Sequence, residues 1–67
     1  MNKKEFLSRM KKYGDTQATL GEALGLPQSA ISGRINGTIE FKKSEINLIR
    51  KRYELSDSDT ILIFFTD

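Results

Sequence analysis

Cysteine and histidine are both absent from this chain of 67 residues. The lack of cysteine excludes disulfides and thiolate ligands, and the lack of histidine excludes Cys/His zinc sites and Ser-His or Cys-His nucleophile pairs. No apolar run approaches the roughly 20 residues that span a bilayer, and the first residues, Met-Asn-Lys-Lys-Glu-Phe, lack the apolar segment of a signal peptide. We therefore expect a cytoplasmic protein that is not an enzyme, uses no cofactor or metal, and binds neither a membrane nor a small-molecule substrate.

Basic residues are missing from the last part of the chain, although the net charge is +2. Residues 1–52 hold all 11 lysines and arginines together with five acids, whereas residues 53–67 hold four acids and no base. A basic body followed by an acidic end favours a polyanionic partner for the body. A solvated surface of mixed charge gives the same pattern, so charge alone leaves both interpretations open.

The composition and spacing predict one small helical domain over residues 1–67. Charged residues make up 30% of the sequence and apolar residues 37%, which is typical of a folded domain. Apolar residues recur at helical spacing, which predicts an all-α fold of five short helices. The expected helix starts are Asn2, Asp15 or Thr16, Pro27, Ser44 and Ser56, and the first three helices are expected to end at Gly14, Gly25 and Asn36-Gly37.

Each expected helix has an apolar face that can pack into a common core. The faces are, in order, Phe6, Met10 and Tyr13; Leu20, Ala23 and Leu24; Ile31 and Ile35; Ile46, Ile49 and Tyr53; and Ile61, Phe64 and Phe65. The loop between the third and fourth helices, residues 38–43, is expected to be held by Ile39 and Phe41. The last helix, residues 56–65, is acidic at its start and apolar at its end.

Two segments also fit strands. Asn36-Gly37 is typical of a hairpin turn, although the preceding segment 31–35 has a glycine at its centre, which is unfavourable in a strand. The run Ile-Leu-Ile-Phe-Phe at 61–65 fits a strand as well as a helix, because periodicity cannot decide so short a run. A mixed fold with strands at 38–41 and 61–65 is therefore the alternative to an all-α fold.

The second and third helices, at about residues 16–36, form a candidate helix-turn-helix. Gly25 provides the turn between them, and Gly21 lies in the middle of the second helix. A glycine inside a helix costs about 1 kcal/mol relative to alanine, and a close crossing with a packed partner helix would explain why it is there. An ordinary corner between two helices of a small bundle has the same pattern and stays open as an alternative.

The run from Gln17 to Gly37, QATLGEALGLPQSAISGRING, resembles the helix-turn-helix of the lambda-repressor-like family, which includes phage repressors and Cro proteins. Gln17 opens the first motif helix and Gln28 opens the second, as in the best-known phage members. The following run, TIEFKKSEI, and the Ile-Phe-Phe run near the end are similar to small phage proteins of Gram-positive hosts, so the resemblance covers nearly the whole chain. It departs in one place, because Arg34 lies where many members have an apolar core residue.

The resemblance implies a sequence-specific DNA-binding transcriptional regulator in the cytoplasm of a bacterial host, a Cro- or repressor-like protein that occupies double-stranded operator DNA. The third helix is then the one that enters the major groove, where small side chains allow close approach. The expected base-contacting residues are Gln28, Ser29, Ala30, Ser32 and Gly33. The expected phosphate-contacting residues are Thr16, Gln17, Arg34, Asn36, Thr38, Lys42 and Lys43. The alternative is that these residues only begin or end helices and cover a solvated surface.

A single module of this size buries little surface on DNA, so pairing across a two-fold site is usual. The acidic and apolar end of the chain predicts a weak homodimer, with Ile61, Phe64 and Phe65 as the interface candidates. Closure of the monomer core by the same residues is the alternative. A function from another class also stays open, namely a protein of helix-turn-helix fold that binds another protein, such as an antirepressor or a repressor modulator.

Overall fold

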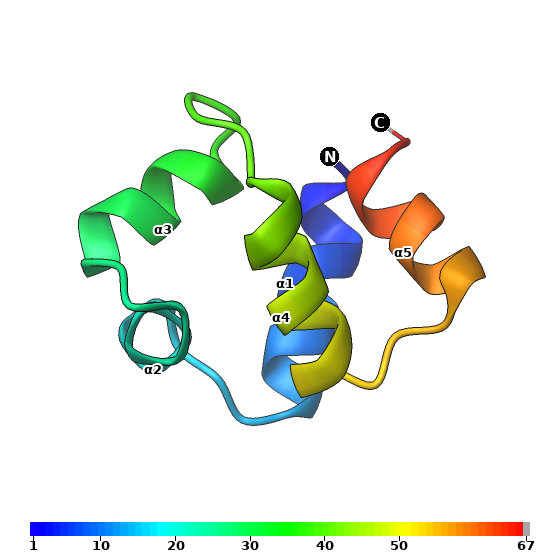
Figure 1. The fold of residues 1–67 in the computed structure, drawn as a ribbon, viewed down its shortest axis with the longest axis horizontal. Helices are drawn as coiled ribbons and strands as arrows, with labels where there is room; N and C mark the ends of the chain where they lie inside the picture. Colours follow the sequence, from blue (N-terminus) through cyan, green and yellow to red (C-terminus); the bar gives the residue numbers. More distant parts are fainter. Residues whose placement is uncertain (67) are drawn as a thin grey trace.

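The structure, a computed structural model, describes residues 1–66, and these form five helices and no strand (Figure 1). The helices are α1 (Lys3–Lys12), α2 (Gln17–Leu24), α3 (Gln28–Ile35), α4 (Lys43–Arg52) and α5 (Asp57–Phe64). The all-α prediction is confirmed, and the described residues contain neither a hairpin at Asn36-Gly37 nor a strand at 61–65. Asp67, one of the four C-terminal acids, lies outside the described residues. None of the five helices is both long enough and apolar enough to cross a membrane.

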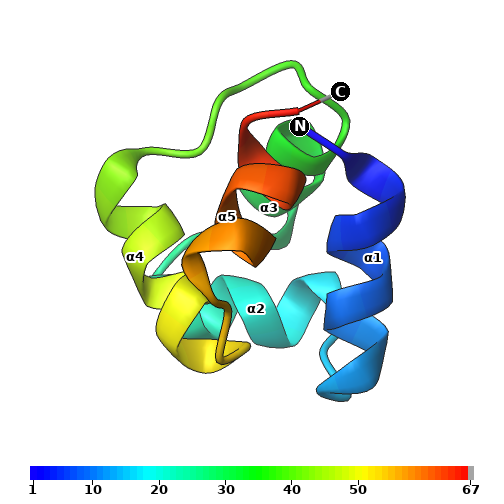
Figure 2. The same ribbon diagram turned by 90° about the vertical axis from the view of Figure 1, so that its right-hand side faces the viewer.

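The helices are arranged around two central ones. In Figure 1, α1 and α4 occupy the middle of the molecule, with α2 and α3 at one end of the long axis and α5 at the other. The view turned by 90° agrees, since α5 lies in front and α3 behind (Figure 2). The chain begins close to the end of α5, where the Asn2 N–H donates to the Ile63 carbonyl over 2.7 Å. The helix pair α2 and α3 and the apolar helix α5 are therefore presented on different sides of the molecule.

A single cluster of buried side chains joins all five helices. Its members are Phe6, Met10, Leu20, Ile31, Ile35, Ile49, Tyr53, Leu55 and Ile63. Aromatic contacts extend the cluster, because the ring of Phe6 lies 5.4 Å from that of Phe41 and 5.9 Å from that of Phe64. Phe41 thus holds the loop between α3 and α4, as expected, whereas Ile39 in the same loop is exposed.

The predicted apolar face of α5 is right for Phe64 and wrong for Ile61 and Phe65. The helix turns Thr60, Ile63 and Phe64 toward the core and leaves Ile61 and Phe65 exposed. Thr60 tolerates this burial because its hydroxyl donates to the Ser56 carbonyl over 2.9 Å. Five consecutive apolar residues contain no periodicity that could have chosen the buried face.

Side-chain caps fix most of the helix starts. The side chain of Asn2 accepts from the Glu5 N–H, that of Thr16 from the Thr19 N–H, and that of Ser56 from the Asp59 N–H. These starts confirm the predictions, with Thr16 rather than Asp15 as the cap of α2. Ser44 is not a cap, because α4 begins one residue before it. The carboxylate of Glu45 accepts a hydrogen bond from the Lys42 N–H over 2.9 Å. It thereby gives a partner to an N–H group at the start of α4 that has none within the helix.

Gly21 explains how α2 and the turn fit together. A Cβ atom at this position would lie 2.6 Å from the carbonyl oxygen of Leu26 and 3.5 Å from Cγ1 of Ile31. Gly25, with φ +70°, ends α2 in the left-handed conformation and lets the Leu26 N–H donate to the Gly21 carbonyl over 2.8 Å. The nearest neighbour of Gly21 is therefore the backbone of the turn and not the crossing helix that the sequence predicted, since Ile31 of α3 lies further away.

Substitution of Gly21 by alanine is expected to destabilise the protein despite the better helix propensity of alanine. The new methyl group meets a backbone carbonyl that cannot move without opening the turn, and overpacking of this kind costs about 1–3 kcal/mol. Urea unfolding of Gly21→Ala beside Glu22→Ala, an exposed neighbour in the same helix, measures the effect. Equal or higher stability of Gly21→Ala would contradict this account of the turn.

Candidate nucleic-acid interface

The outer face of α3 presents a row of small uncharged side chains. Ile31 and Ile35 are 0% and 4% exposed, and their burial fixes which side of the helix faces solvent. Gln28 and Ser29 in the first turn are exposed, and Ala30, Ser32 and Gly33 are partly exposed. The structure thus brings the five expected base-contacting residues onto the surface of one helix.

Gly33 has a neighbour that the sequence did not indicate. A Cβ atom there would lie 3.2 Å from Cδ1 of Ile39, and the N–H groups of Thr38 and Ile39 both donate to the Gly33 carbonyl. The loop after α3 therefore folds back over the end of the helix. The absent side chain of Gly33 makes room for Ile39, which gives this glycine a packing role in addition to any approach of a ligand.

The end of α3 carries a polar cluster that includes Lys3, a residue that the sequence did not indicate as part of the site. Nζ of Lys3 donates to Oδ1 of Asn36 over 3.0 Å, and Nδ2 of Asn36 donates to Oγ of Ser32 over 3.4 Å. Lys3 begins α1 and is 33 residues away in the chain, so only the fold brings its ammonium group to this site. The sequence indicated no more than a basic N-terminal pair, Lys3-Lys4.

The start of α2 and the start of α4 complete the set of expected phosphate contacts. Thr16 and Gln17 lie at the N-terminus of α2, where the first N–H groups have no partner within the helix. Thr16 and Thr38 are exposed and Gln17 is partly exposed. Lys42 and Lys43, at the start of α4, are also exposed. These groups are donors at the surface that an anion can reach.

Arg34 is placed differently from the other expected phosphate contacts. Its side chain is 7% exposed, and Nε and Nη2 donate to the two carboxylate oxygens of Glu45 over 2.9 and 3.2 Å. Nη1 donates to the Ala30 carbonyl over 3.0 Å. Burial by itself raises the pKa of Glu45, but the hydrogen bonds from Arg34 and from the Lys42 N–H outweigh burial, so the pKa lies below its usual value. The structure does not bring Arg34 to the surface that carries Asn36 and the lysines.

All four arginines of residues 1–66 form ion pairs, whereas none of the seven lysines does so within that range. The pairs are Arg9–Asp59, Arg34–Glu45, Arg50–Asp57 and Arg52–Asp15. Asp57 and Asp59, whose spacing resembles that of calcium ligands, are thus engaged by arginines. In the part of the chain that the structure describes, no three acidic side chains gather as a metal site would require. The cations left to attract an anion are lysines.

The carboxylate of Asp15 ties the start of α2 to α4. Its oxygens accept hydrogen bonds from Nε and Nη2 of Arg52, each over 2.7 Å, from the Tyr53 hydroxyl over 2.6 Å and from the Thr19 hydroxyl over 2.8 Å. The hydrogen bonds from Arg52 hold the pKa of Asp15 far below its usual range, against the opposing effect of burial. Burial and the hydrogen bond to Asp15 raise the pKa of Tyr53. The first turn of α2 is therefore held in place by an ionised, almost fully buried carboxylate.

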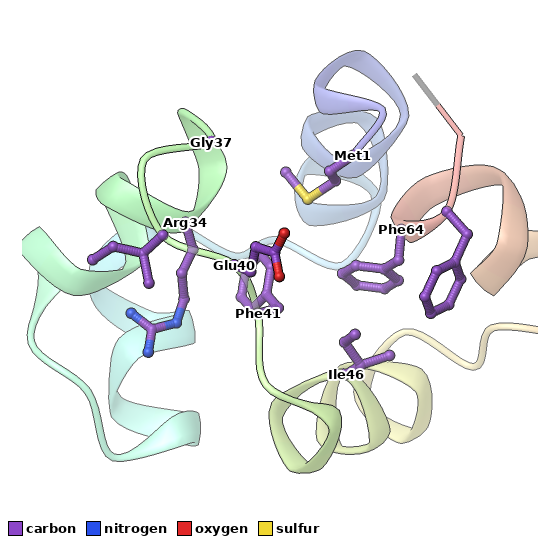
Figure 3. Close-up of a pocket in the computed structure, with 9 residues that line it drawn as sticks. Met1, Arg34, Gly37, Glu40, Phe41, Ile46 and Phe64 are labelled. Atoms are coloured by element: carbon purple, nitrogen blue, oxygen red, sulfur yellow. The ribbon is translucent and has the colours of Figure 1, made fainter.

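The dimer candidates at the other end of the molecule fall into two groups. Ile61 and Phe65 are 56% and 68% exposed, and Leu62 beside them is also exposed. Phe64 is half-buried, and Figure 3 shows it directed toward Phe41 and Ile46 across a pocket of about 290 Å³. The expected interface residues are thus divided between an exposed surface and the edge of the core.

Comparison of the chain with models of protein families, with curated proteins and with solved structures gives no match. The lambda-repressor-like family therefore stays a prediction from the motif.

Replacement of Asp15 by asparagine is expected to lower the free energy of unfolding by about 1–3 kcal/mol at pH 7, the range for buried charge-assisted hydrogen bonds. Because the folded pKa of Asp15 is depressed, its contribution is complete above the usual aspartate pKa and is lost as the pH falls through the folded value. The difference between wild type and Asp15→Asn should therefore shrink below about pH 4.

Denaturant unfolding as a function of pH measures this difference. Asp57→Asn is the control, because its pair with Arg50 is exposed and such pairs contribute about 0–1 kcal/mol. A loss for Asp15→Asn that is independent of pH, or no larger than that of the control, would contradict the role assigned to Asp15.

Proposed function

We propose that this protein is a sequence-specific double-stranded DNA-binding transcriptional regulator that acts by occupying an operator. The observation that carries the proposal is the outer face of α3, which is uncharged, made of small side chains and bordered by lysines and an asparagine. Residues 25–39 contain no acid that would repel a phosphate. Uncharged side chains can donate to and accept from base edges in the major groove, and the lack of acids avoids repulsion of the phosphates.

The first turn of α3 is the proposed base-contacting segment. The carboxamide of Gln28 can pair in a bidentate manner with N6 and N7 of adenine, and the Ser29 hydroxyl can donate to or accept from most base edges. The Ala30 methyl group suits contact with a thymine methyl. Ser32 and Gly33 lie one turn further along, where they allow the backbone to come close to the DNA.

Phosphate contacts would come from the elements around α3. Thr16 and Gln17 present the N-terminus of α2, whose free N–H groups favour an anion. Asn36 and Thr38 follow α3, with Lys3 beside Asn36. Lys42 and Lys43 continue the same basic border from α4. Phosphate contacts set the affinity and the orientation of a protein on DNA, whereas base contacts, here from the α3 face, determine which DNA sequence is bound.

Self-association through α5 is part of the proposal. Ile61, Leu62 and Phe65 form an exposed apolar surface at the end of the molecule opposite α2 and α3 (Figures 1 and 2). A second copy paired through this surface leaves both α3 helices free to contact DNA, as a two-fold operator requires. Phe64 is half-buried and would pack beneath the exposed residues of this interface.

The same exposed surface favours the alternative function, which is binding to another protein. Monomeric proteins expose scattered apolar residues, whereas contiguous apolar patches mark interaction sites, and three large exposed residues gather here at the end of α5. In this alternative the protein is an antirepressor or a repressor modulator, and the α3 face has no DNA ligand.

Selection from a library of random duplexes at physiological salt tests the proposal directly. An enriched inverted repeat with half-sites about 34 Å apart, one helical turn, is the expected result for a dimer that contacts two major grooves. An enriched unrepeated site supports DNA binding by a monomer. The proposed function would be contradicted if no sequence were enriched and the affinity for DNA depended on salt but not on sequence.

Two variants should separate base contacts from phosphate contacts. Gln28→Ala is expected to lose about 1–3 kcal/mol of discrimination at one base pair while the salt dependence of binding stays unchanged. Lys42→Ala is expected to weaken binding to all sequences and to reduce the slope of log K against log salt by about 0.9.

Fluorescence anisotropy with the selected duplex and a scrambled duplex, at several salt concentrations, measures both quantities. Lys51→Ala, which removes an exposed lysine from the last turn of α4, is the matched control and should change neither. If Gln28→Ala behaved like the control, the first turn of α3 would not be the base-contacting segment.

A further inference from the structure

Arg34 and Glu45 form the most buried ion pair among residues 1–66. The side chains are 7% and 10% exposed, and two nearly parallel N–H donors of the guanidinium face the two carboxylate oxygens. This bidentate geometry fixes the relative orientation of both groups as well as their distance. Figure 3 shows the Arg34 guanidinium directed away from Phe41 and Phe64, although Arg34 lines the same pocket as these two rings.

Stability alone does not account for a buried ion pair at this position. Taking two charges out of water is costly, and replacement of a buried ion pair by apolar side chains of similar volume is often neutral or stabilising. A buried ion pair is therefore weak evidence of a role in stability alone. An apolar contact does not fix the relative orientation of two helices. The bidentate pair does fix it, for the two helices α3 and α4 that carry Arg34 and Glu45.

The remaining hydrogen bonds of the pair show which parts it connects. On the α3 side, Nη1 of Arg34 donates to the carbonyl of Ala30, one turn earlier, in the proposed base-contacting segment. On the α4 side, Oε1 of Glu45 also accepts from the Lys42 N–H and so fixes the start of that helix. A continuous set of hydrogen bonds thus leads from Ala30 to the backbone of Lys42.

We infer that Arg34 and Glu45 are a positioning pair that holds the base-contacting face of α3 in a fixed orientation relative to the phosphate-contacting lysines at the start of α4. The inference depends on the proposed function. It assigns Arg34 an indirect role, because the guanidinium acts through Ala30 and Glu45 and touches neither base nor phosphate. Loss of the pair then reduces discrimination between DNA sequences and leaves the number of phosphate contacts unchanged.

The double variant Arg34→Met with Glu45→Leu tests the inference, since it replaces the pair by apolar side chains and leaves the net charge unaltered. The ratio of affinities for the selected duplex and a scrambled duplex is expected to fall about tenfold, comparable with the loss of one base contact. The slope of log K against log salt on the scrambled duplex should equal that of wild type, because no phosphate contact is removed. Thermal unfolding of the same sample shows whether the fold is retained.

The control is Arg50→Met with Asp57→Asn, which removes one base and one acid from an exposed pair between α4 and α5. It should leave both the affinity ratio and the salt slope unchanged. A slope reduced by about 0.9 in the Arg34 variant would instead show a direct phosphate contact and overturn the inference. An unchanged affinity ratio in a folded double variant would also overturn it, because the pair would then be only a packing contact.

Arg34→Lys keeps the inference testable if the double variant does not fold. Lysine retains the charge but not the bidentate geometry, so the expected result is a reduced affinity ratio with an unchanged slope. A wild-type affinity ratio for Arg34→Lys would show that charge alone is sufficient and would contradict the positioning role. Failure of the proposed function looks different, because wild-type protein itself would then not distinguish the two duplexes.

Discussion

The orientation of α3 about its own axis is the constraint on which the rest of this structure depends. Ile31 and Ile35 turn one side of the helix into the core, and the buried bidentate pair between Arg34 and Glu45 fixes the adjoining side. A rotation of α3 would expose an isoleucine or separate a buried charge from its partner, and both changes are unfavourable. The small polar side chains that remain outside are therefore presented in one defined direction.

The two kinds of basic residue have different tasks in this molecule. Two of the arginines join elements that are distant in sequence, since Arg9–Asp59 joins α1 to α5 and Arg52–Asp15 joins α4 to the segment before α2. The planar guanidinium suits such fixed geometry, whereas the lysine ammonium is a mobile charge that remains solvated. The lysines thus give the surface its positive field, which favours the polyanionic partner of the proposed function.

Local sequence patterns predicted the helices well. They could not predict contacts between segments that are distant in the sequence. Capping residues such as Asn2, and glycines that end helices, act within one turn, so the sequence displays them directly. The buried face of α5 depends on which of five successive apolar residues meets the core, and no local spacing decides that. Arg34 looked like a phosphate contact because its buried partner, Glu45, lies on another helix. The approach of Lys3 to Asn36 likewise exists only in the fold.

The most direct test of the central claim is an NMR titration of ¹⁵N-labelled protein with the duplex recovered by selection. If the outer face of α3 contacts the bases, the largest amide shift changes should fall on residues 28–33. Smaller changes are expected around Asn36 and at Lys42 and Lys43, where phosphates would bind. If the changes fell on residues 61–65 alone and the amides of α3 did not move, the account of α3 as the DNA-contacting helix would be contradicted.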